Sequence, residues 1–204
     1  MNRTSLMRLL ALLCPALSLM LLEPRVFVSA VAAEELSAEA IAKALKGRKT
    51  RSGPGDTIAR KEIEELKRIR KTRAWNLHDR TQLAEVTRDL PQVDVEIYFA
   101  FDSAEILPQA QPTLDKLGTA LSQEGLKGSA FVLAGHADAK GTAEYNHTLS
   151  ERRAEAVKHY LKEKFNLSAD DLMTVGYGFE QLKDPDHPLS EVNRRVQVVN
   201  FSSN

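Results

Sequence analysis

From residue 92 onward, the hydrophobic and polar positions alternate between patterns that predict strands and patterns that predict helices. Val93–Phe99 alternates apolar with mostly acidic residues, which indicates a half-buried strand. Three further strands are expected at Ala130–Ala134, Leu172–Tyr177 and Arg195–Phe201. Two helices are expected between them, one that begins at Pro108 and one over Thr142–Phe165. This β-α-β-α-β-β order predicts an α+β fold, a two-layer sandwich with two helices on one face of a mixed sheet.

Residues 34–91 show a different pattern that is mostly helical. Glu34–Leu45 spaces its apolar residues as a short amphipathic helix, and Gly47–Gly55 then interrupts regular structure with three glycines and a proline. Thr57–Trp75 predicts a helix with a narrow apolar stripe, and Arg80–Asp89 predicts a shorter one that ends before a proline. Because a narrow stripe buries little, we expect residues 34–91 to form a charged spacer, partly helical or partly disordered, ahead of a domain over residues 92–204.

Charge is distributed unevenly along the chain, although its 28 basic and 28 acidic residues cancel. Residues 34–91 hold 14 basic and 10 acidic groups, whereas residues 92–204 hold 11 and 17. This distribution argues against a nucleic-acid partner for the whole chain. The spacer has two possible roles. It is either only a solvated connector, or its local basic strip contacts anionic envelope polymers or lipid. The strip consists of Lys67, Arg68, Arg70, Lys71 and Arg73.

The first 33 residues have the pattern of a secretory signal peptide. Leu9–Leu22 runs 14 residues without a charge, after Arg3 and Arg8 and before a small-residue site that ends at Ala33. That run is too short for a spanning helix, which needs about 20 residues, although an uncleaved N-terminal anchor is the alternative. The only cysteine, Cys14, lies inside the run and is expected to be removed with it. An exported protein without a thiol has no disulfides, thiolate metal sites or cysteine nucleophiles.

Candidate chemistry is concentrated in Gly135–Ala154, where the second predicted strand ends and the long helix begins. Leu149, Arg153 and Val157 are spaced by four, so Arg153 falls on the inward stripe of the helix or on its border. A buried guanidinium requires an anionic partner. Asp138 and Arg153 in one cleft would suit a zwitterionic ligand, with Asn146 two turns away on the same face. The alternative is that Asp138 and Arg153 pair with each other as a structural clamp.

The string GHADAKGTAEYNHTLSERRAEAV resembles the signature of the OmpA/MotB-like C-terminal domain, the peptidoglycan-associating module of Gram-negative envelopes. IYFAFDSAEI at Ile97–Ile106 resembles the first strand and following loop of that family, and NRRVQVVNF at Asn193–Phe201 resembles its closing strand. The similarity covers about residues 92–202 and does not extend into the charged spacer.

The resemblance implies non-covalent binding of the peptidoglycan stem peptide through its meso-diaminopimelate residue. Asp138 would then hold the ammonium group of that residue and Arg153 its carboxylate. One departure from the family pattern is Ala137, which replaces the usual threonine beside the aspartate and removes a hydroxyl group from the site. The other residues that the resemblance assigns to the pocket or its edge are Phe101, Asp102, Ser103, Asn146, Leu149 and either Arg194 or Arg195.

Nothing in the sequence indicates an enzyme, a cofactor or a metal centre. There is no Gly-x-Ser-x-Gly elbow, no glycine-rich phosphate loop and no His-x-x-x-His pair, and His136 is expected to be a hydrogen-bonded residue at a strand end.

We therefore expect a periplasmic binding protein associated with the outer membrane and the cell wall. It would tether another outer-membrane or periplasmic protein through residues 34–91, with a homodimer left open. The alternative is a protein-interaction module that uses the long loop Phe179–Val192.

Overall fold

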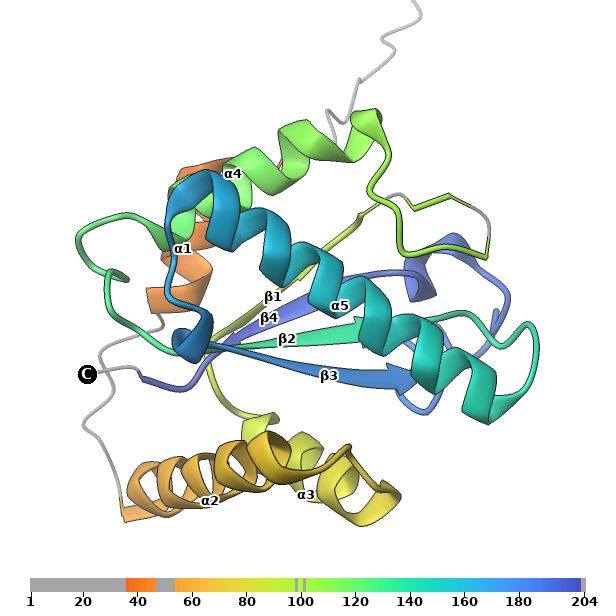
Figure 1. Cartoon of the computed structure of the whole chain (residues 1–204), viewed down its shortest axis with the longest axis horizontal. Helices are drawn as coiled ribbons and strands as arrows, with labels where there is room; N and C mark the ends of the chain where they lie inside the picture. Colours follow the sequence, from red (N-terminus) through yellow and green to blue (C-terminus); the bar gives the residue numbers. More distant parts are fainter. Residues whose placement is uncertain (1–35, 47–53, 98, 101, 203–204) are drawn as a thin grey trace, which may run out of the picture. The chain divides into compact units, whose positions relative to one another are not determined.

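The computed structural model describes residues 36–46, 54–97, 99–100 and 102–202 of the 204-residue chain. The signal-peptide and Cys14 predictions lie outside the described residues. The structure has helices α1 (Ala38–Lys46), α2 (Pro54–Thr72), α3 (Leu77–Thr87), α4 (Gln111–Leu121) and α5 (Ala143–Phe165), and strands β1 (Gln92–Val95), β2 (Phe131–His136), β3 (Leu172–Gly178) and β4 (Val196–Asn200) (Figure 1). Short 3-10 turns occur at Pro108–Ala110, Ala169–Asp171 and Glu191–Asn193. No helix within the described ranges is long and apolar enough to cross a membrane.

The four strands form one mixed sheet in the order β1-β4-β2-β3. β2 and β3 are parallel, and β4 runs antiparallel to both of its neighbours. The predicted strand positions are confirmed, but β1 ends at Val95, whose partner Val196 is the first residue of β4. Beyond that point the chain forms a loop, in which Phe99 and Ile106 make an isolated antiparallel bridge.

The predicted pair of helices, α4 and α5, covers one face of the sheet and encloses the main core. A Cβ at Gly135 would overlap the carbonyl oxygen of Ser150, and one at Gly176 would overlap that of His147. Helix α5 therefore lies directly on the glycines of β2 and β3. This close approach fixes the height and the rotation of α5 over the sheet.

Helix α1 packs into the same core through Ile41, Ala42 and Leu45, which are 0–2% exposed. The side-chain amide of Asn200 in β4 also donates a hydrogen bond to the carbonyl oxygen of Leu45, at 3.0 Å. The predicted amphipathic pattern of this segment is therefore used to cover the core.

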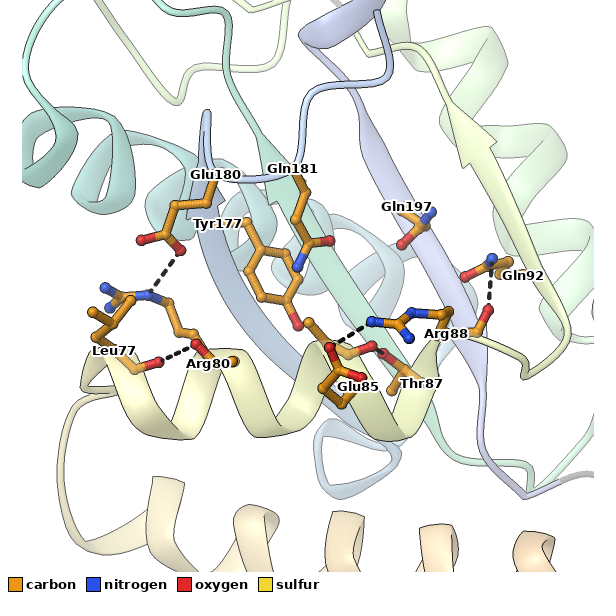
Figure 2. A pocket seen from close by; sticks show the side chains of 12 residues that line it. Leu77, Arg80, Glu85, Thr87, Arg88, Gln92, Tyr177, Glu180, Gln181 and Gln197 are labelled. Carbon is orange, nitrogen blue, oxygen red and sulfur yellow. Dashed lines mark hydrogen bonds and ion pairs between the residues drawn. The ribbon is translucent and has the colours of Figure 1, made fainter. Parts of the chain in front are cut away.

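Helices α2 and α3 pack on the opposite face of the sheet, so the expectation that this segment buries little is wrong. Ile63, Leu66, Trp75 and Leu83 are buried there against side chains of β2, β3 and β4. The indole nitrogen of Trp75 donates to the carbonyl oxygen of Thr174 in β3, at 2.8 Å. Each helix alone has a narrow stripe, but the two stripes together cover one face of the sheet. Helix α3 also borders a polar groove on this face (Figure 2).

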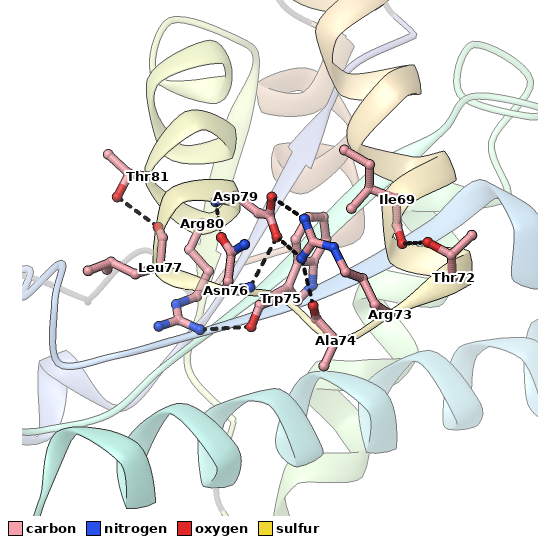
Figure 3. A network of polar contacts seen from close by, with 10 residues as sticks. All are labelled: Ile69, Thr72, Arg73, Ala74, Trp75, Asn76, Leu77, Asp79, Arg80 and Thr81. Carbon is pink, nitrogen blue, oxygen red and sulfur yellow. Dashed lines mark hydrogen bonds and ion pairs between the residues drawn. The ribbon is translucent and has the colours of Figure 1, made fainter.

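A polar network fixes the corner between α2 and α3 (Figure 3). The side chain of Asn76 accepts from the backbone amide of Asp79 at 2.8 Å, and the carboxylate of Asp79 accepts from the amide of Asn76 at 3.0 Å. This capping box begins α3 three residues earlier than the apolar pattern predicts. Arg73, at the end of α2, donates to both carboxylate oxygens of Asp79, and its side-chain hydrogen bond lowers the pKa of that carboxyl group. The corner is therefore held by ordered contacts.

Four of the five cations of the basic strip are paired with carboxylates. Arg68 pairs with Glu65 at 3.4 Å and Arg73 with Asp79, both within the α2–α3 segment. The other two pairs reach the rest of the domain, from Arg70 to Glu151 at 2.5 Å and from Lys71 to Asp170 at 3.1 Å. These pairs leave little uncompensated positive charge on α2 for a polyanion. The strip instead helps to attach α2 to the domain.

Candidate functional site

A cleft of about 580 Å³ lies where β2 ends and α5 begins. Its walls are the loop that follows β2, the first three turns of α5 and the loop that follows β1. The predicted site residues that line it are Asp102, Asp138, Asn146, Leu149, Arg153 and Arg194. The structure therefore brings Asp102 and Arg194, which are distant in sequence, next to the four residues of the segment 138–153, at the edge where the parallel strands end.

Arg153 is the most deeply placed cation of the cleft. Its residue is 9% exposed, as the inward stripe of α5 predicts. Nε donates to the carbonyl oxygen of Ser103 at 3.0 Å, and the guanidinium carbon lies 5.0 Å from the centre of the Phe99 ring. Burial lowers the pKa of Arg153, and the charge of Arg194 adds to this effect. A guanidinium nevertheless stays protonated, so the cleft presents a partly desolvated positive charge.

Asp138 pairs with Arg194 and not with Arg153. Its Oδ2 accepts from Nη1 of Arg194 at 2.8 Å, and its Oδ1 accepts from the backbone amide of Lys140 at 3.1 Å. Arg194 also donates to Glu191 at 2.6 Å. The structural-clamp alternative expected Asp138 to pair with Arg153, but within the described residues Asp138 pairs with Arg194. The charge of Arg153 is therefore available to a ligand in the cleft.

Asn146 holds the loop between β2 and α5 in place. Its side-chain nitrogen donates to the carbonyl oxygens of Lys140 at 2.8 Å and Thr142 at 3.1 Å, and the residue is 2% exposed. Gly141 adopts a φ of +101° in this loop, which a side chain would disfavour. The hydroxyl of Thr142 then caps α5 by accepting from the amide of Tyr145 at 3.3 Å. Asn146 therefore positions the loop that carries Asp138.

The opposite wall contains a residue in a strained conformation. Asp102 has a φ of +53°, in the left-handed region that residues other than glycine seldom adopt. The amide of Ser103 donates to the carbonyl oxygen of Ala100 at 3.2 Å, which closes a tight turn around Asp102. Such strain is typical of residues that a surrounding structure holds for a function. Phe101, the neighbouring predicted site residue, lies outside the described residues.

Arg195 does not line the cleft, so of the two arginines that were named as alternatives only Arg194 belongs to it. It is 7% exposed and lies on the α3 side of the sheet, where its Nε pairs with Asp94 at 3.1 Å. Consecutive residues at the start of a strand point to opposite faces, so Arg194 and Arg195 cannot both reach one cleft.

Sequence reasoning missed five lining residues that the structure adds, which are Phe99, Ala100, Lys140, Gly141 and Tyr145. Phe99 stacks under Arg153, while Lys140 and Tyr145 extend the wall on the side of α5. The strand alternation before Asp102 was a signal for Phe99. The positions of Lys140 and Tyr145, close to Asp138 and Asn146, were signals for those two residues. Together the described lining has two carboxylates and three cations, which suits a ligand with both charges or with a carboxylate. No group of three or more potential metal ligands occurs among the described residues.

Comparisons with known proteins match the part of the chain that forms this cleft. The family model described as "OmpA family" matches residues 98–195. The peptidoglycan-associated lipoprotein of Pseudomonas aeruginosa is 40% identical over 105 residues, which are 50% of this chain and 59% of that protein. The protein of the same name from Pasteurella multocida is 38% identical over 114 residues, which are 55% of this chain and 74% of that protein.

Among solved structures, the peptidoglycan-associated lipoprotein of Burkholderia pseudomallei is similar at a TM-score of 0.43 and 29% identity, over 51% of this chain and 87% of that one. The chain spans 59% of the length of the curated relative from Pseudomonas aeruginosa and 74% of the length of the one from Pasteurella multocida. With the family model and these relatives in agreement, the chain belongs to the OmpA family.

Proposed function

We propose that this protein binds peptidoglycan non-covalently in the cell envelope, and that the cleft holds the meso-diaminopimelate residue of the stem peptide. The single observation that carries the proposal is the buried guanidinium of Arg153. Its Nε is used by the carbonyl oxygen of Ser103, whereas Asp138 is paired elsewhere. A carboxylate that enters the cleft would meet this charge and form a bidentate, charge-assisted pair.

The second charge of such a ligand has two candidate partners. The side chain of meso-diaminopimelate ends in a carbon that bears both an ammonium and a carboxylate group. With the carboxylate on Arg153, the ammonium group would lie near Asp138 or Asp102, which both line the cleft. Because Arg194 already compensates part of the charge of Asp138, we assign Asp102 a share in binding the ammonium group. Relatives whose names state peptidoglycan association support this ligand class.

The proposal gives the protein a tethering role in the periplasm, without catalysis. The helices of residues 34–91 would present the surface for another envelope protein. Ile58 and Leu77 in these helices, which are 58% and 59% exposed, would supply the apolar contacts. A homodimer would use the same kind of contact.

Co-sedimentation of the full chain with insoluble peptidoglycan sacculi tests the proposal. Arg153→Gln removes the charge of the cleft, and a charged hydrogen bond of this kind implies a loss of affinity of about tenfold or more. Arg152→Gln is the matched control, because it changes the same residue type at the next, exposed position of α5. Thermal unfolding followed by circular dichroism establishes that both variants fold.

Two results would contradict the proposal. In the first, the wild type does not sediment with sacculi. In the second, a folded Arg153→Gln variant binds as well as the Arg152→Gln control. The protein-interaction alternative would then gain support, since Leu189 in the loop after β3 is 63% exposed and offers an apolar contact for a partner.

A further inference from the structure

A second hollow lies on the opposite face of the sheet from the cleft, between α3 and strands β1, β3 and β4. This α3 groove has a volume of about 480 Å³, and most of the residues that line it are polar (Figure 2). One wall is the polar side of α3, and the other wall includes Gln92, Gln197 and the segment Tyr177–Gln181. Residues of α3 lie outside the range matched by the family model, so nothing in that match assigns this groove a role.

The charges of the α3 groove compensate one another. Arg88 pairs with Glu85 on the same helix at 2.5 Å, and Arg80 pairs across the groove with Glu180 at 3.7 Å. Figure 2 shows both pairs at opposite ends of α3. The described lining therefore has no net charge to attract an ion, and a charged ligand would have to displace existing pairs. The groove suits a neutral ligand.

Two amide groups of the lining each use one donor within the protein. The side-chain nitrogen of Gln197 donates to Asp94 at 3.2 Å, and that of Gln92 donates to the carbonyl oxygen of Arg88 at 3.3 Å. One N–H of each amide is engaged in this way, which leaves the second N–H as a donor and the side-chain carbonyl oxygen as an acceptor. A ligand with hydroxyl groups, which both donate and accept, suits these positions.

The two threonines of α3 present acceptors to the groove. The hydroxyl of Thr81 donates to the carbonyl oxygen of Leu77 at 2.9 Å, and that of Thr87 donates to Leu83 at 2.7 Å. Each hydroxyl oxygen retains lone pairs that can accept. A row of acceptors along a neutral groove is complementary to a row of hydroxyl groups.

Tyr177 supplies a group that has no protein partner. The residue is 3% exposed, and its phenol hydroxyl has no hydrogen-bond partner among the described residues. Figure 2 shows its ring in the wall of the groove, with the oxygen directed towards α3. A buried hydroxyl without a partner is costly, so its presence in the wall of a polar groove points to a ligand that pairs with it. Leu77, 59% exposed at the end of the groove, adds an apolar surface.

We propose that the α3 groove binds a neutral oligosaccharide. Sugars donate and accept through closely spaced hydroxyl groups, carry no charge and have apolar faces, which matches the acceptors, the charge balance and the exposed leucine of this groove. The source that we favour is the glycan strand of peptidoglycan, a choice that rests on the proposed function. Another neutral glycan would satisfy the same chemistry.

Titration of the isotope-labelled full chain with two oligosaccharides, followed by amide chemical shifts, tests the proposal. Tetra-N-acetylchitotetraose represents an acetylated amino-sugar strand, and maltotetraose represents a neutral glucan without acetamido groups. We expect shifts in α3 and at Gln197, with dissociation constants no weaker than about 10 mM. Shifts with the acetylated oligomer alone would support the peptidoglycan source, and shifts with maltotetraose would support a neutral sugar from another source. Failure of both to bind would overturn the proposal.

A pair of tyrosine variants separates binding from folding. Tyr177→Phe removes only the unpartnered hydroxyl, so we expect stability at least equal to that of the wild type and a loss of sugar affinity of about fivefold, the value of one hydrogen bond. Tyr160→Phe is the matched control, because its hydroxyl donates to Asp115 at 2.7 Å outside both sites. It should lose stability and keep sugar affinity. Equal sugar affinity in the wild type and Tyr177→Phe would contradict the proposal.

The cleft and the groove can be tested separately. Arg153→Gln should leave oligosaccharide binding unchanged, because α5 and α3 lie on opposite faces of the sheet. If this variant keeps sugar binding but the wild type fails to sediment with sacculi, the proposed function and the peptidoglycan source both fail, while the α3 groove stands as a site for another neutral glycan. Loss of sugar binding in a folded Arg153→Gln variant would place the sugar in the cleft and overturn the groove assignment.

Discussion

Truncation of one buried isoleucine tests whether α2 belongs to the folded domain. Ile63 is 0% exposed against the second face of the sheet, whereas Ile58, five residues earlier on the same helix, is 58% exposed. Ile→Ala removes three carbon atoms, which at about 0.8 kcal/mol each amounts to roughly 2.5 kcal/mol, and the remaining cavity adds to this loss. We therefore expect Ile63→Ala to lower the free energy of unfolding by about 3 kcal/mol. Ile58→Ala should change it by less than about 0.5 kcal/mol.

The only tryptophan of the chain provides the assay. Trp75 is 7% exposed, and its indole nitrogen bonds to β3, so its fluorescence reports whether the α2–α3 corner is attached to the sheet. Circular dichroism reports the helices of the whole domain. In urea, both signals should change in one transition that shifts to lower urea concentration for Ile63→Ala. The reasoning is refuted if the two isoleucine variants are equally stable, or if the Trp75 transition of the wild type precedes the loss of helix.

Three further predictions concern the buried glycine, the buried histidine and the loop of the cleft. Gly176→Ala places a Cβ against the backbone of α5 and should cost about 1–3 kcal/mol in urea unfolding; an unchanged midpoint would contradict this close approach. Burial, with a contribution from Arg195, lowers the pKa of His136 to about 3, whereas the unfolded chain titrates near 6.5. As the pH drops, the unfolded state binds the proton before the folded state does. The free energy of unfolding therefore falls between about pH 6.5 and pH 3, by up to about 1.4 kcal/mol per pH unit. His136→Gln should flatten this slope between pH 6.5 and 4.5. Asn146→Ala should speed backbone hydrogen exchange in residues 138–142, while unchanged exchange would show that its two hydrogen bonds do not hold the loop.

The sheet and its first helical layer were predictable because their signals are local and long. Strands β2 and β3 are continuous apolar runs, and α5 keeps a helical stripe over 23 residues. The second layer was not predictable from the width of its stripes, since Ile63 and Leu83 belong to two helices that cover the sheet only together. The capping box that begins α3, Asn76 and Asp79, is readable in the sequence and gives the correct start of that helix.

The members of the cleft were predictable from spacing and resemblance, but their pairing was not. Arg153 falls on the inward side of α5 by its four-residue spacing, and the structure confirms this position. The partner of Asp138 is Arg194, which lies 56 residues further along the chain and depends on how the loop after β3 folds. No periodicity encodes such a contact. Strand alternation, however, already separates Arg194 from Arg195, and it assigns them to opposite faces.

Helix α1 determines how mechanical force would enter the domain. A pull on the chain ahead of residue 36 acts first on α1, whose Ile41 and Leu45 are fully buried in the main core. The hydrogen bond from Asn200 joins the end of α1 to β4, an interior strand of the sheet, so tension passes into the sheet there before it reaches α2. We therefore expect the helices of the second face, and the α3 groove with them, to be shielded from a pull applied at residue 36.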